Sequence, residues 1–286
     1  MVPEWRVLGR VLGGGRHTLI MGVLNVTPDS FSDGGRYSGP EEAVTRGLEM
    51  VADGADIVDV GGESTRPGAQ PVDAAEERRR VLPVVRALAD AGVVVSIDTC
   101  KAAVAAAALD AGAAIVNDVT ALGDRGMAGL VAGSGAGVVL MHMQGTPRIM
   151  QADPRYDDVV ADVRSFLLER AEEARSAGIS AERICLDPGI GFGKRLQHNL
   201  ALLRAIPTLA AEGYPVLVGV SRKSFIEGIL GPLAPDHRDQ ASAAAQVLAI
   251  AGGASVLRLH NVVVGLQTAR IADAIVRGFG AREKAW

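Results

Sequence analysis

The sequence predicts an α/β fold, a (β/α)8 TIM barrel with an N-terminal hairpin that plugs the amino-terminal mouth of the barrel. Three observations support this prediction. The chain has eight short apolar runs rich in Val and Ile, each run stops on a polar residue or a turn, and consecutive runs leave room for one helix. Runs of this kind, without polar alternation, are typical of strands buried on both faces. Eight βα units in roughly 250 residues match a closed barrel.

The apolar runs define the expected strands in chain order. They are TLIMGVLN (ending at Asn25), DIVDVGGES (Ser64), VVVSIDT (Thr99), AAIVND (Asp118), GVVLMHM (Met143), RICLDPG (Gly189), PVLVGVSRK (Lys223) and SVLRLHN (Asn261). Because the chemistry of such barrels lies at the carboxyl ends of the strands, the polar residues there are the candidate active site.

The segments between the runs carry helix signals. Pro40 begins the first helix, and Asp73 with Glu76 makes a capping pattern for the second. Pro83 lies inside the second helix and predicts a kink or break near Leu82. Further helices are expected over 100–111, 124–133, 157–178, 198–212, 224–230, 238–252 and 262–279.

The chain is expected to form one domain, 1–286, with its core over 18–278. Residues 4–17 predict the hairpin, with its turn around Gly13–Gly15. No linker or internal repeat divides the sequence. Two connections are long and rich in Ser, Thr, Asp, Pro and Gly: Asn25–Gly39 and Gly61–Asp73. Since they lie on the catalytic rim, they are interpreted as functional lids rather than as flexible surface excursions.

Composition excludes several classes of protein. A net charge of −4 and a pI near 5.8 argue against nucleic acid as a partner. Every long apolar run is interrupted well short of the ~18 residues of a membrane span, so no membrane partner is expected. With only Cys100 and Cys185, a disulfide framework is not expected, and a reducing cytosol (cytoplasmic localisation) is the simplest compartment.

Side chains alternate along a strand, so a period of two predicts which polar residues face the barrel interior. Five residues fall on one inner surface near the carboxyl ends, and Lys223 joins them. A set of buried charges without partners would be too costly for an ordinary core. The five are Asp98, Asn117, Asp187, Arg258 and His260.

Simpler interpretations exist for single residues. Asp98 before Thr99 could cap the next helix, and Asp118, on the outward face, is better explained as a cap. Asp187 could belong to a turn, and His142 is typical of a core histidine. The string GFGK at Gly191–Lys194 lacks the spacing of a P-loop. Neither cysteine has zinc-ligand spacing.

The chemistry of the set divides into two groups. Carboxylates and an amide at Asp98, Asn117 and Asp187 suit a flat heterocycle with several N–H donors. Positive charge at Arg66, Arg258 and His260, beside the neutral oxygen of Asn25, suits a pyrophosphate and a hard divalent ion. Together they indicate group transfer with a phosphate leaving group.

Eight strings resemble those of the dihydropteroate synthases, folate-pathway enzymes, across about residues 18–278. They are MGVLNVTPDSFSDGG (21–35), DVGGESTRPGA (59–69), SIDT (96–99), VNDV (116–119), LMHMQGTPRIMQ (140–151), LDPGIGFGK (186–194), SRKSFI (221–226) and LRLHNV (257–262). The resemblance implies a transferase that condenses 6-hydroxymethyl-7,8-dihydropterin pyrophosphate with p-aminobenzoate, giving 7,8-dihydropteroate and pyrophosphate, with Mg²⁺. It also implies a homodimer and a target of sulfonamides.

The resemblance also implies a role for each site residue. The pterin would be bound by Asp98, Asn117, Met141, Asp187 and Lys223. The pyrophosphate would be bound by Asn25, Arg66, Arg258 and His260, with Asn25 the metal ligand. The p-aminobenzoate would be bound by Thr65, Pro67, Phe192 and Ser224. The catalytic residues would be Phe31, Asp33, Lys223, Arg258 and His260.

The reaction implied by the resemblance is dissociative (SN1-like). The C–O bond to pyrophosphate breaks first, and the aromatic amine then attacks the cation, so no strong general base is needed. Two alternatives remain open: a pterin-binding methyltransferase of the corrinoid type, which would share the pterin carboxylates but not the first lid, and a catalytically silent paralogue.

Overall fold

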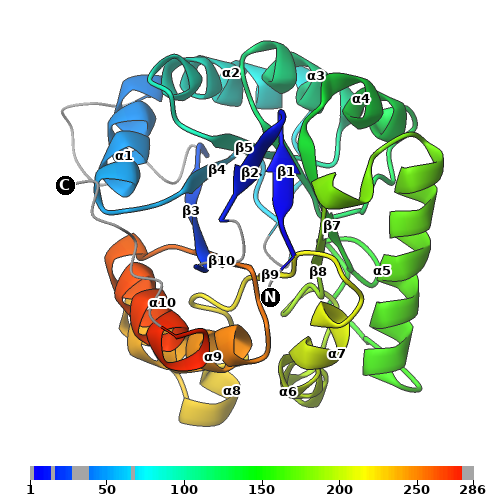
Figure 1. The fold of residues 1–286 in the computed structure, drawn as a ribbon, viewed down its shortest axis with the longest axis vertical. Coiled ribbons are helices and arrows are strands. Elements are labelled where there is room, and N and C mark those ends of the chain that lie inside the picture. Colours follow the sequence, from blue (N-terminus) through cyan, green and yellow to red (C-terminus); the bar gives the residue numbers. More distant parts are fainter. Residues whose placement is uncertain (1–2, 14–16, 28–38, 66–67, 279–286) are drawn as a thin grey trace.

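Eight parallel strands form a barrel, and the helices surround it (Figure 1). The computed structural model describes residues 3–13, 17–27, 39–65 and 68–278. The barrel strands are β3 (Leu19–Asn25), β4 (Ile57–Gly61), β5 (Val95–Asp98), β6 (Ile115–Asp118), β7 (Gly137–Met141), β8 (Ile184–Asp187), β9 (Leu217–Val218) and β10 (Val256–Leu259).

The strand order is β8-β7-β6-β5-β4-β3-β10-β9, and a single parallel bridge between Leu186 and Val216 brings β8 beside β9. The predicted barrel is therefore confirmed. Strands β4 to β8 are buried along their whole length, which accounts for their lack of polar alternation.

The helices follow the strands as expected, with boundaries shifted by a few residues at several ends. They are α1 (Pro40–Ala52), α2 (Ala74–Asp90), α3 (Ala102–Asp110), α4 (Met127–Ser134), α5 (Val159–Ser176), α6 (Leu196–Arg204), α7 (Ile206–Ala210), α8 (Glu227–Leu230), α9 (Asp239–Ala251) and α10 (Val262–Val276), with short 3-10 turns at Ala181–Arg183 and Pro235–Arg238. No described helix is long and apolar enough to cross a membrane.

Helix α2 corrects one expectation and confirms another. The helix runs through Pro83 without the predicted break, because Val81, Val84 and Leu88 are fully buried and hold both sides of the proline against the barrel. Asp73 caps the helix as predicted, accepting hydrogen bonds from the backbone N–H groups of residues 75 and 76, each at 2.9 Å.

The helix expected over 198–212 is instead two helices, α6 and α7, separated at Ala205. Pro207 lies in the first turn of α7. A proline there has no N–H to continue the hydrogen-bond ladder of α6, and its ring restricts the residue before it.

The N-terminal hairpin consists of β1 (Trp5–Val7) and β2 (Arg10–Leu12). Its turn is at Leu8 and Gly9, whose φ angles of 47° and 74° suit a tight two-residue hairpin turn. The prediction of a turn around Gly13–Gly15 was therefore wrong; residues 14–16 lie outside the described part.

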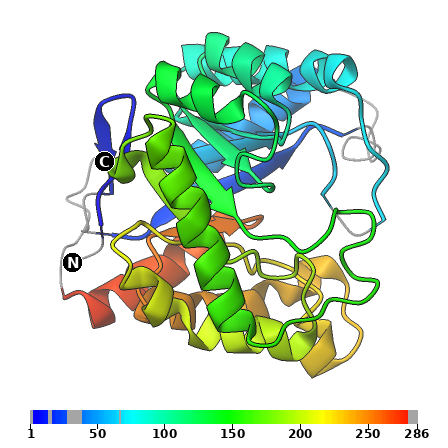
Figure 2. The same cartoon turned by 90° about the vertical axis from the view of Figure 1, so that its right-hand side faces the viewer.

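The hairpin plugs the amino-terminal mouth, as predicted. Trp5 is 1% exposed and belongs to the cluster that fills the barrel interior. Its Nε1 donates to the Arg183 carbonyl at 3.0 Å, just before β8, and the Leu8 N–H donates to the Gly135 carbonyl at 3.1 Å, just before β7. Figure 2 shows the hairpin at one end of the barrel.

Candidate active site

The predicted inner face exists. Ile115, Cys185 and Val256 belong to the interior cluster, and each lies two residues before a polar site residue. Leu257 and Leu259 instead join the core between strands and helices. A period of two therefore places Asn117, Asp187 and Arg258 in the barrel mouth, as predicted from the sequence.

Arg258 connects two carboxylates across the barrel. Its Nε donates to Asp59 Oδ2 at 2.6 Å, and its Nη2 donates to Asp98 Oδ2 at 2.7 Å. Asn117 Nδ2 donates to the same Asp59 oxygen at 3.0 Å. Asp59 was not among the predicted site residues, although it lies two residues after the interior residue Ile57 and the same alternation predicts it.

The second oxygens of these carboxylates remain available. Within the described residues, Asp59 Oδ1 and Asp98 Oδ1 are buried and have no hydrogen-bond partner. Burial raises the pKa of Asp98 to about 7; the charge of Arg258 opposes the rise, and the charge of Asp59 adds to it. Burial lowers the pKa of Arg258, but Asp59 and Asp98 reverse this effect, so its pKa is raised.

Asp187 lies at the end of β8 beside a sharp turn. Its Oδ1 accepts the Gly189 N–H at 2.7 Å, so the turn and the site are parts of one arrangement. Gly189 has φ +65°, and a Cβ there would lie 1.9 Å from the His142 carbonyl oxygen. Burial raises the pKa of Asp187, against the charge of Lys223 and the hydrogen bond from Gly189.

Lys223 lies between the Asp187 turn and Phe192. Its Nζ donates to the Ile190 carbonyl and lies 4.6 Å from the centroid of the Phe192 ring. Burial lowers the pKa of Lys223 to about 8, against the charge of Asp187. The structure therefore brings together Lys223 of the predicted pterin group and Phe192 of the predicted p-aminobenzoate group.

The backbone before Lys223 is held in an unusual conformation. Arg222 has φ +60°, rare for a residue with a side chain. Its guanidinium makes two hydrogen bonds to Asp239, at 2.7 and 2.9 Å, and its N–H donates to Ser242 Oγ at 3.0 Å. These contacts fix the loop that carries Lys223.

His260 lies at the end of β10 and is half-buried. Its Nδ1 is 3.1 Å from Ser221 Oγ, and its N–H donates to the same oxygen at 3.2 Å. Ser221, like Asp59, is a residue of the site that was not predicted from the sequence.

The remaining predicted residues lie around the same mouth or beyond the described part. Met141 is buried at the end of β7, in register with Asp187. Asn25 ends β3 and Thr65 follows β4, both half-buried, while Ser224 is exposed. Phe31, Asp33, Arg66 and Pro67 lie outside the described residues.

Contacts decide the simpler interpretations of Asp98 and Asp118. Asp98 faces Arg258 and caps no helix. Asp118 does not cap a helix, contrary to expectation: it accepts hydrogen bonds from the N–H groups of Thr120 and Leu122 at 2.8 Å each, in the loop after β6, and α4 begins only at Met127.

Lys194 of the GFGK string is buried and donates to the carbonyls of His142 at 3.2 Å and Phe192 at 2.9 Å. These contacts give the string a structural role. His142 is buried beside Phe166 and Tyr156, as expected for a core histidine.

The site can be tested for Mg²⁺ by its donor set. Within the described residues, no group of three or more His, Cys, Asp or Glu side chains could hold a metal. Mg²⁺ does not require one, since it keeps several waters and is often bound by few protein ligands plus substrate phosphates. A single neutral oxygen from Asn25 fits that pattern.

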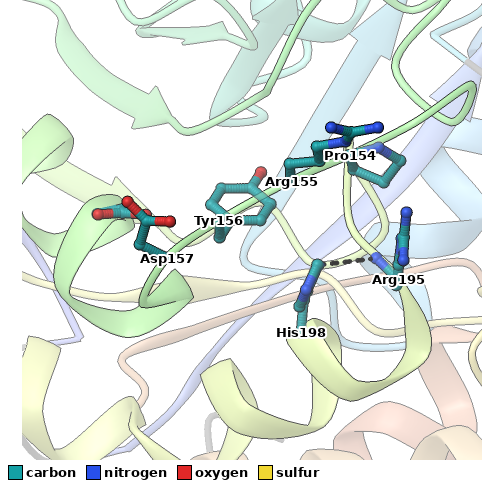
Figure 3. A pocket seen from close by; sticks show the side chains of 7 residues that line it. Pro154, Arg155, Tyr156, Asp157, Arg195 and His198 are labelled. Atoms are coloured by element: carbon teal, nitrogen blue, oxygen red, sulfur yellow. Dashed lines mark hydrogen bonds between the residues drawn. The ribbon is translucent and has the colours of Figure 1, made fainter.

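A hollow of about 450 Å³ lies elsewhere, between the segment before α5 and the start of α6 (Figure 3). None of the predicted site residues lines it. Tyr156 at its wall donates to the Gly193 carbonyl at 2.7 Å, and the Arg195 N–H donates to His198 Nδ1 at 3.2 Å. The lining residues are Pro154, Arg155, Tyr156, Asp157, Asp162, Arg195 and His198.

Comparison with known proteins decides the family. A model of the pterin binding enzymes matches residues 21–260. The dihydropteroate synthase of Mycobacterium leprae is 48% identical over 268 residues, 89% of this chain and 92% of that protein. The chain belongs to the dihydropteroate synthase family. Its members are transferases, and this chain is an enzyme of that class.

Solved structures of dihydropteroate synthases support the same family assignment. The Xanthomonas albilineans enzyme with 4-aminobenzoic acid has 44% identity and a TM-score of 0.90, covering 96% of this chain and 98% of that one. The Burkholderia cenocepacia enzyme with 7,8-dihydropteroate has 42% identity and a TM-score of 0.87, covering 96% and 97%. The Yersinia pestis enzyme with a sulfonamide drug has 42% identity and a TM-score of 0.89, covering 95% and 98%.

Proposed function

We propose that this chain joins 6-hydroxymethyl-7,8-dihydropterin pyrophosphate to p-aminobenzoate by a dissociative reaction, with Mg²⁺, giving 7,8-dihydropteroate and pyrophosphate. The observation that carries the proposal is the pair of buried carboxylates, Asp59 and Asp98, each with one oxygen bound to Arg258 and the other without a partner in the described structure. Dihydropteroate synthases crystallised with 4-aminobenzoic acid and with 7,8-dihydropteroate support the choice of substrates.

The pterin would be bound by acceptors on one side and a cation on the other. Asp98 and Asp187 offer carboxylate oxygens to the ring N–H and amino groups, and Asn117 both donates and accepts. Lys223 would donate to the pterin carbonyl, while Met141 offers an apolar, polarisable surface. Because Arg258 binds both Asp59 and Asp98, these acceptors are oriented before the ligand arrives.

The pyrophosphate would be bound at the rim by Asn25, Arg66 and His260, together with the N–H groups of Arg258 that the carboxylates leave unused. Mg²⁺ bound at Asn25 would neutralise charge on the departing pyrophosphate. Ser221, already beside His260, holds that imidazole in place.

In the proposed reaction, the C–O bond at the pterin methylene breaks and its electron pair leaves with pyrophosphate. The amine nitrogen of p-aminobenzoate then forms the new C–N bond and loses one proton to solvent. Thr65, Pro67, Phe192 and Ser224 would position the amine, so the protein supplies orientation and charge stabilisation rather than a strong base. Asp33 and Phe31, on the first lid, would face the cation.

A kinetic isotope measurement tests this order of events. Substrate carrying deuterium on the reacting methylene should react with a normal secondary isotope effect, because that carbon becomes planar before the amine attacks. When p-aminobenzoate is withheld, an ¹⁸O label at the oxygen that joins the methylene carbon to phosphorus should also scramble into the non-bridging positions on that phosphorus. An isotope effect near unity together with no scrambling would show direct displacement by the amine.

Three further expectations belong to this proposal. We expect sulfonamides to compete with p-aminobenzoate, as the drug complex of the Yersinia pestis relative suggests. The homodimer and the cytoplasmic setting stay predictions, the first to be checked by light scattering and the second by cell fractionation.

A further inference from the structure

Three charged side chains form a cluster behind the loop between β4 and α2, outside the site described above. Lys101 Nζ donates to Glu63 Oε2 and to Glu77 Oε2. The Glu77 side chain is 1% exposed, whereas Lys101 and Glu63 are 23% and 22% exposed. A buried carboxylate of this kind is stable only with a cation beside it, so the ion pair with Lys101 is needed for the burial of Glu77.

Glu63 joins the two ends of the loop. Its Oε2 is bound to Lys101, and its Oε1 accepts the Val72 N–H at 3.3 Å. The segment 64–71 therefore begins and ends at one carboxylate. Thr65, Arg66 and Pro67 lie within this segment.

Helix α2 holds the base of the same loop from behind. Arg80 Nη1 donates to the Gly62 carbonyl at 2.9 Å. A Cβ at Gly62 would lie 2.7 Å from Val81 Cγ1 and 3.0 Å from Glu77 Cγ, so only glycine allows this close approach. The start of the loop is thus fixed by backbone and side-chain contacts together.

The cluster also lies close along the chain to a residue on the predicted pterin side of the mouth. Lys101 follows β5 by three residues, and β5 ends at Asp98. The charge of Glu77 raises the pKa of Asp98, although less than burial does. The cluster therefore lies near the strand that carries Asp98.

We propose that Glu63, Lys101 and Glu77 form a clasp that positions the β4–α2 loop for binding of p-aminobenzoate. This proposal rests on the proposed function. Fixing a loop in advance lowers the conformational entropy lost when a small ligand binds. The three are positioning residues, since they act through the loop that carries Thr65 rather than on the substrate.

The clasp predicts a selective effect on one substrate. Glu63→Gln keeps an acceptor for the Val72 N–H but removes the charge that binds Lys101. In the full-length enzyme, the KM for p-aminobenzoate should rise roughly tenfold, because loss of one hydrogen bond to a charged group weakens binding by about this factor. The dissociation constant of the pterin substrate, measured by calorimetry, should stay at the wild-type value. Lys101→Arg should preserve the wild-type KM, and Lys101→Met should raise it.

Glu212→Gln is the matched control. Glu212 is 20% exposed and pairs with Arg164 at 2.6 Å, so the substitution removes a similar ion pair at a distant place, just before β9. Its KM for p-aminobenzoate should be unchanged. Equal KM values in the two Gln variants, or a parallel loss of affinity for both substrates in Glu63→Gln, would overturn the clasp. If the wild-type enzyme makes no dihydropteroate, the proposed function itself fails, and the clasp fails with it.

Discussion

At the scale of single residues, the centre of the barrel mouth is an arrangement of charges that stabilise one another. Asp59 and Asp98 are buried, and Arg258 is the cation that makes their burial tolerable. Each carboxylate uses one oxygen for this purpose, and within the described residues the other has no hydrogen-bond partner. Under the proposed function, both the stability of the protein and pterin recognition should therefore depend on the same three side chains.

Asp98→Asn tests that dual role. The variant keeps the shape of the side chain but loses a charged acceptor, so pterin affinity should fall by about 1.5–3 kcal/mol, a roughly 10- to 100-fold weaker dissociation constant. Calorimetric titration with a dihydropterin measures this dissociation constant. Asp118→Asn is the control: within the described residues its carboxylate accepts hydrogen bonds from Thr120 and Leu122, so the variant should have lower thermal stability and unchanged pterin affinity.

The pH dependence of kcat/KM for the pterin substrate follows from two shifted groups. The pKa of Asp98 is raised to about 7 and that of Lys223 is lowered to about 8, each mainly by burial. Binding needs the ionised carboxylate and the protonated amine, so kcat/KM should rise toward pH 7 and fall above pH 8. Asp98→Asn should remove the acidic limb and leave the alkaline limb. An acidic limb that persists in this variant would contradict the assignment.

The sequence was sufficient to predict which polar residues face the mouth, because strand alternation determines the face of each side chain. Asp98, Asn117, Asp187 and Arg258 all follow from it. It was not sufficient to predict that Arg258 reaches Asp59 and Asp98, since that depends on the curvature of the ring that brings β10 across from β5. The hydrogen bonds from Lys194 to two carbonyls were not predictable either, because they depend on how the loop after β8 lies against the end of β7.

At the scale of elements, the long helix α2 shows tertiary packing overriding a local signal. Pro83 predicts a break, yet the helix continues because its buried face is anchored on both sides of the proline. Helices α6 and α7 show the opposite outcome, since there the chain does separate close to Pro207. The prolines look similar in sequence, and only the packing around them distinguishes the two cases.

Pro83→Ala should therefore stabilise the protein. Proline in a helix interior is about 3 kcal/mol less favourable than alanine, while the proline's restriction of the unfolded chain recovers only about 0.4–1 kcal/mol. The midpoint of thermal unfolding should rise. Arg86→Ala, an exposed position three residues further along the same helix, serves as the reference. A lower midpoint for Pro83→Ala than for the reference would show that the proline ring makes necessary contacts.

At the scale of the whole molecule, the two mouths of the barrel have separate tasks. The hairpin, seen at one end of the barrel in Figure 2, fills the amino-terminal mouth, whereas Asp98, Asp187 and Arg258 lie at or near the carboxyl ends of their strands. Eight repeated strand patterns made this architecture predictable. The hollow beside α6 was not predictable, because it arises from how the loop before α5 lies on the barrel.

Trp5→Ala tests whether the hairpin at the amino-terminal mouth acts on stability alone, without affecting the site at the carboxyl-terminal mouth. Removing a buried Trp costs about 3–5 kcal/mol, and its hydrogen bond to the Arg183 carbonyl is lost as well. The thermal midpoint should fall while both KM values, measured well below that temperature, stay unchanged. Arg6→Ala, on the exposed side of the same strand, should alter neither. A raised KM in Trp5→Ala would mean that the plug shapes the site at the opposite end.

The central claim is that this chain forms 7,8-dihydropteroate, and product analysis tests it most directly. The purified enzyme is mixed with 6-hydroxymethyl-7,8-dihydropterin pyrophosphate, p-aminobenzoate and Mg²⁺, and dihydropteroate and pyrophosphate are quantified together. The account predicts equal amounts of both products and a strong loss of both in Asp187→Asn. No dihydropteroate from the folded wild-type enzyme, despite measurable pterin binding, would contradict it and indicate a catalytically silent pterin-binding protein.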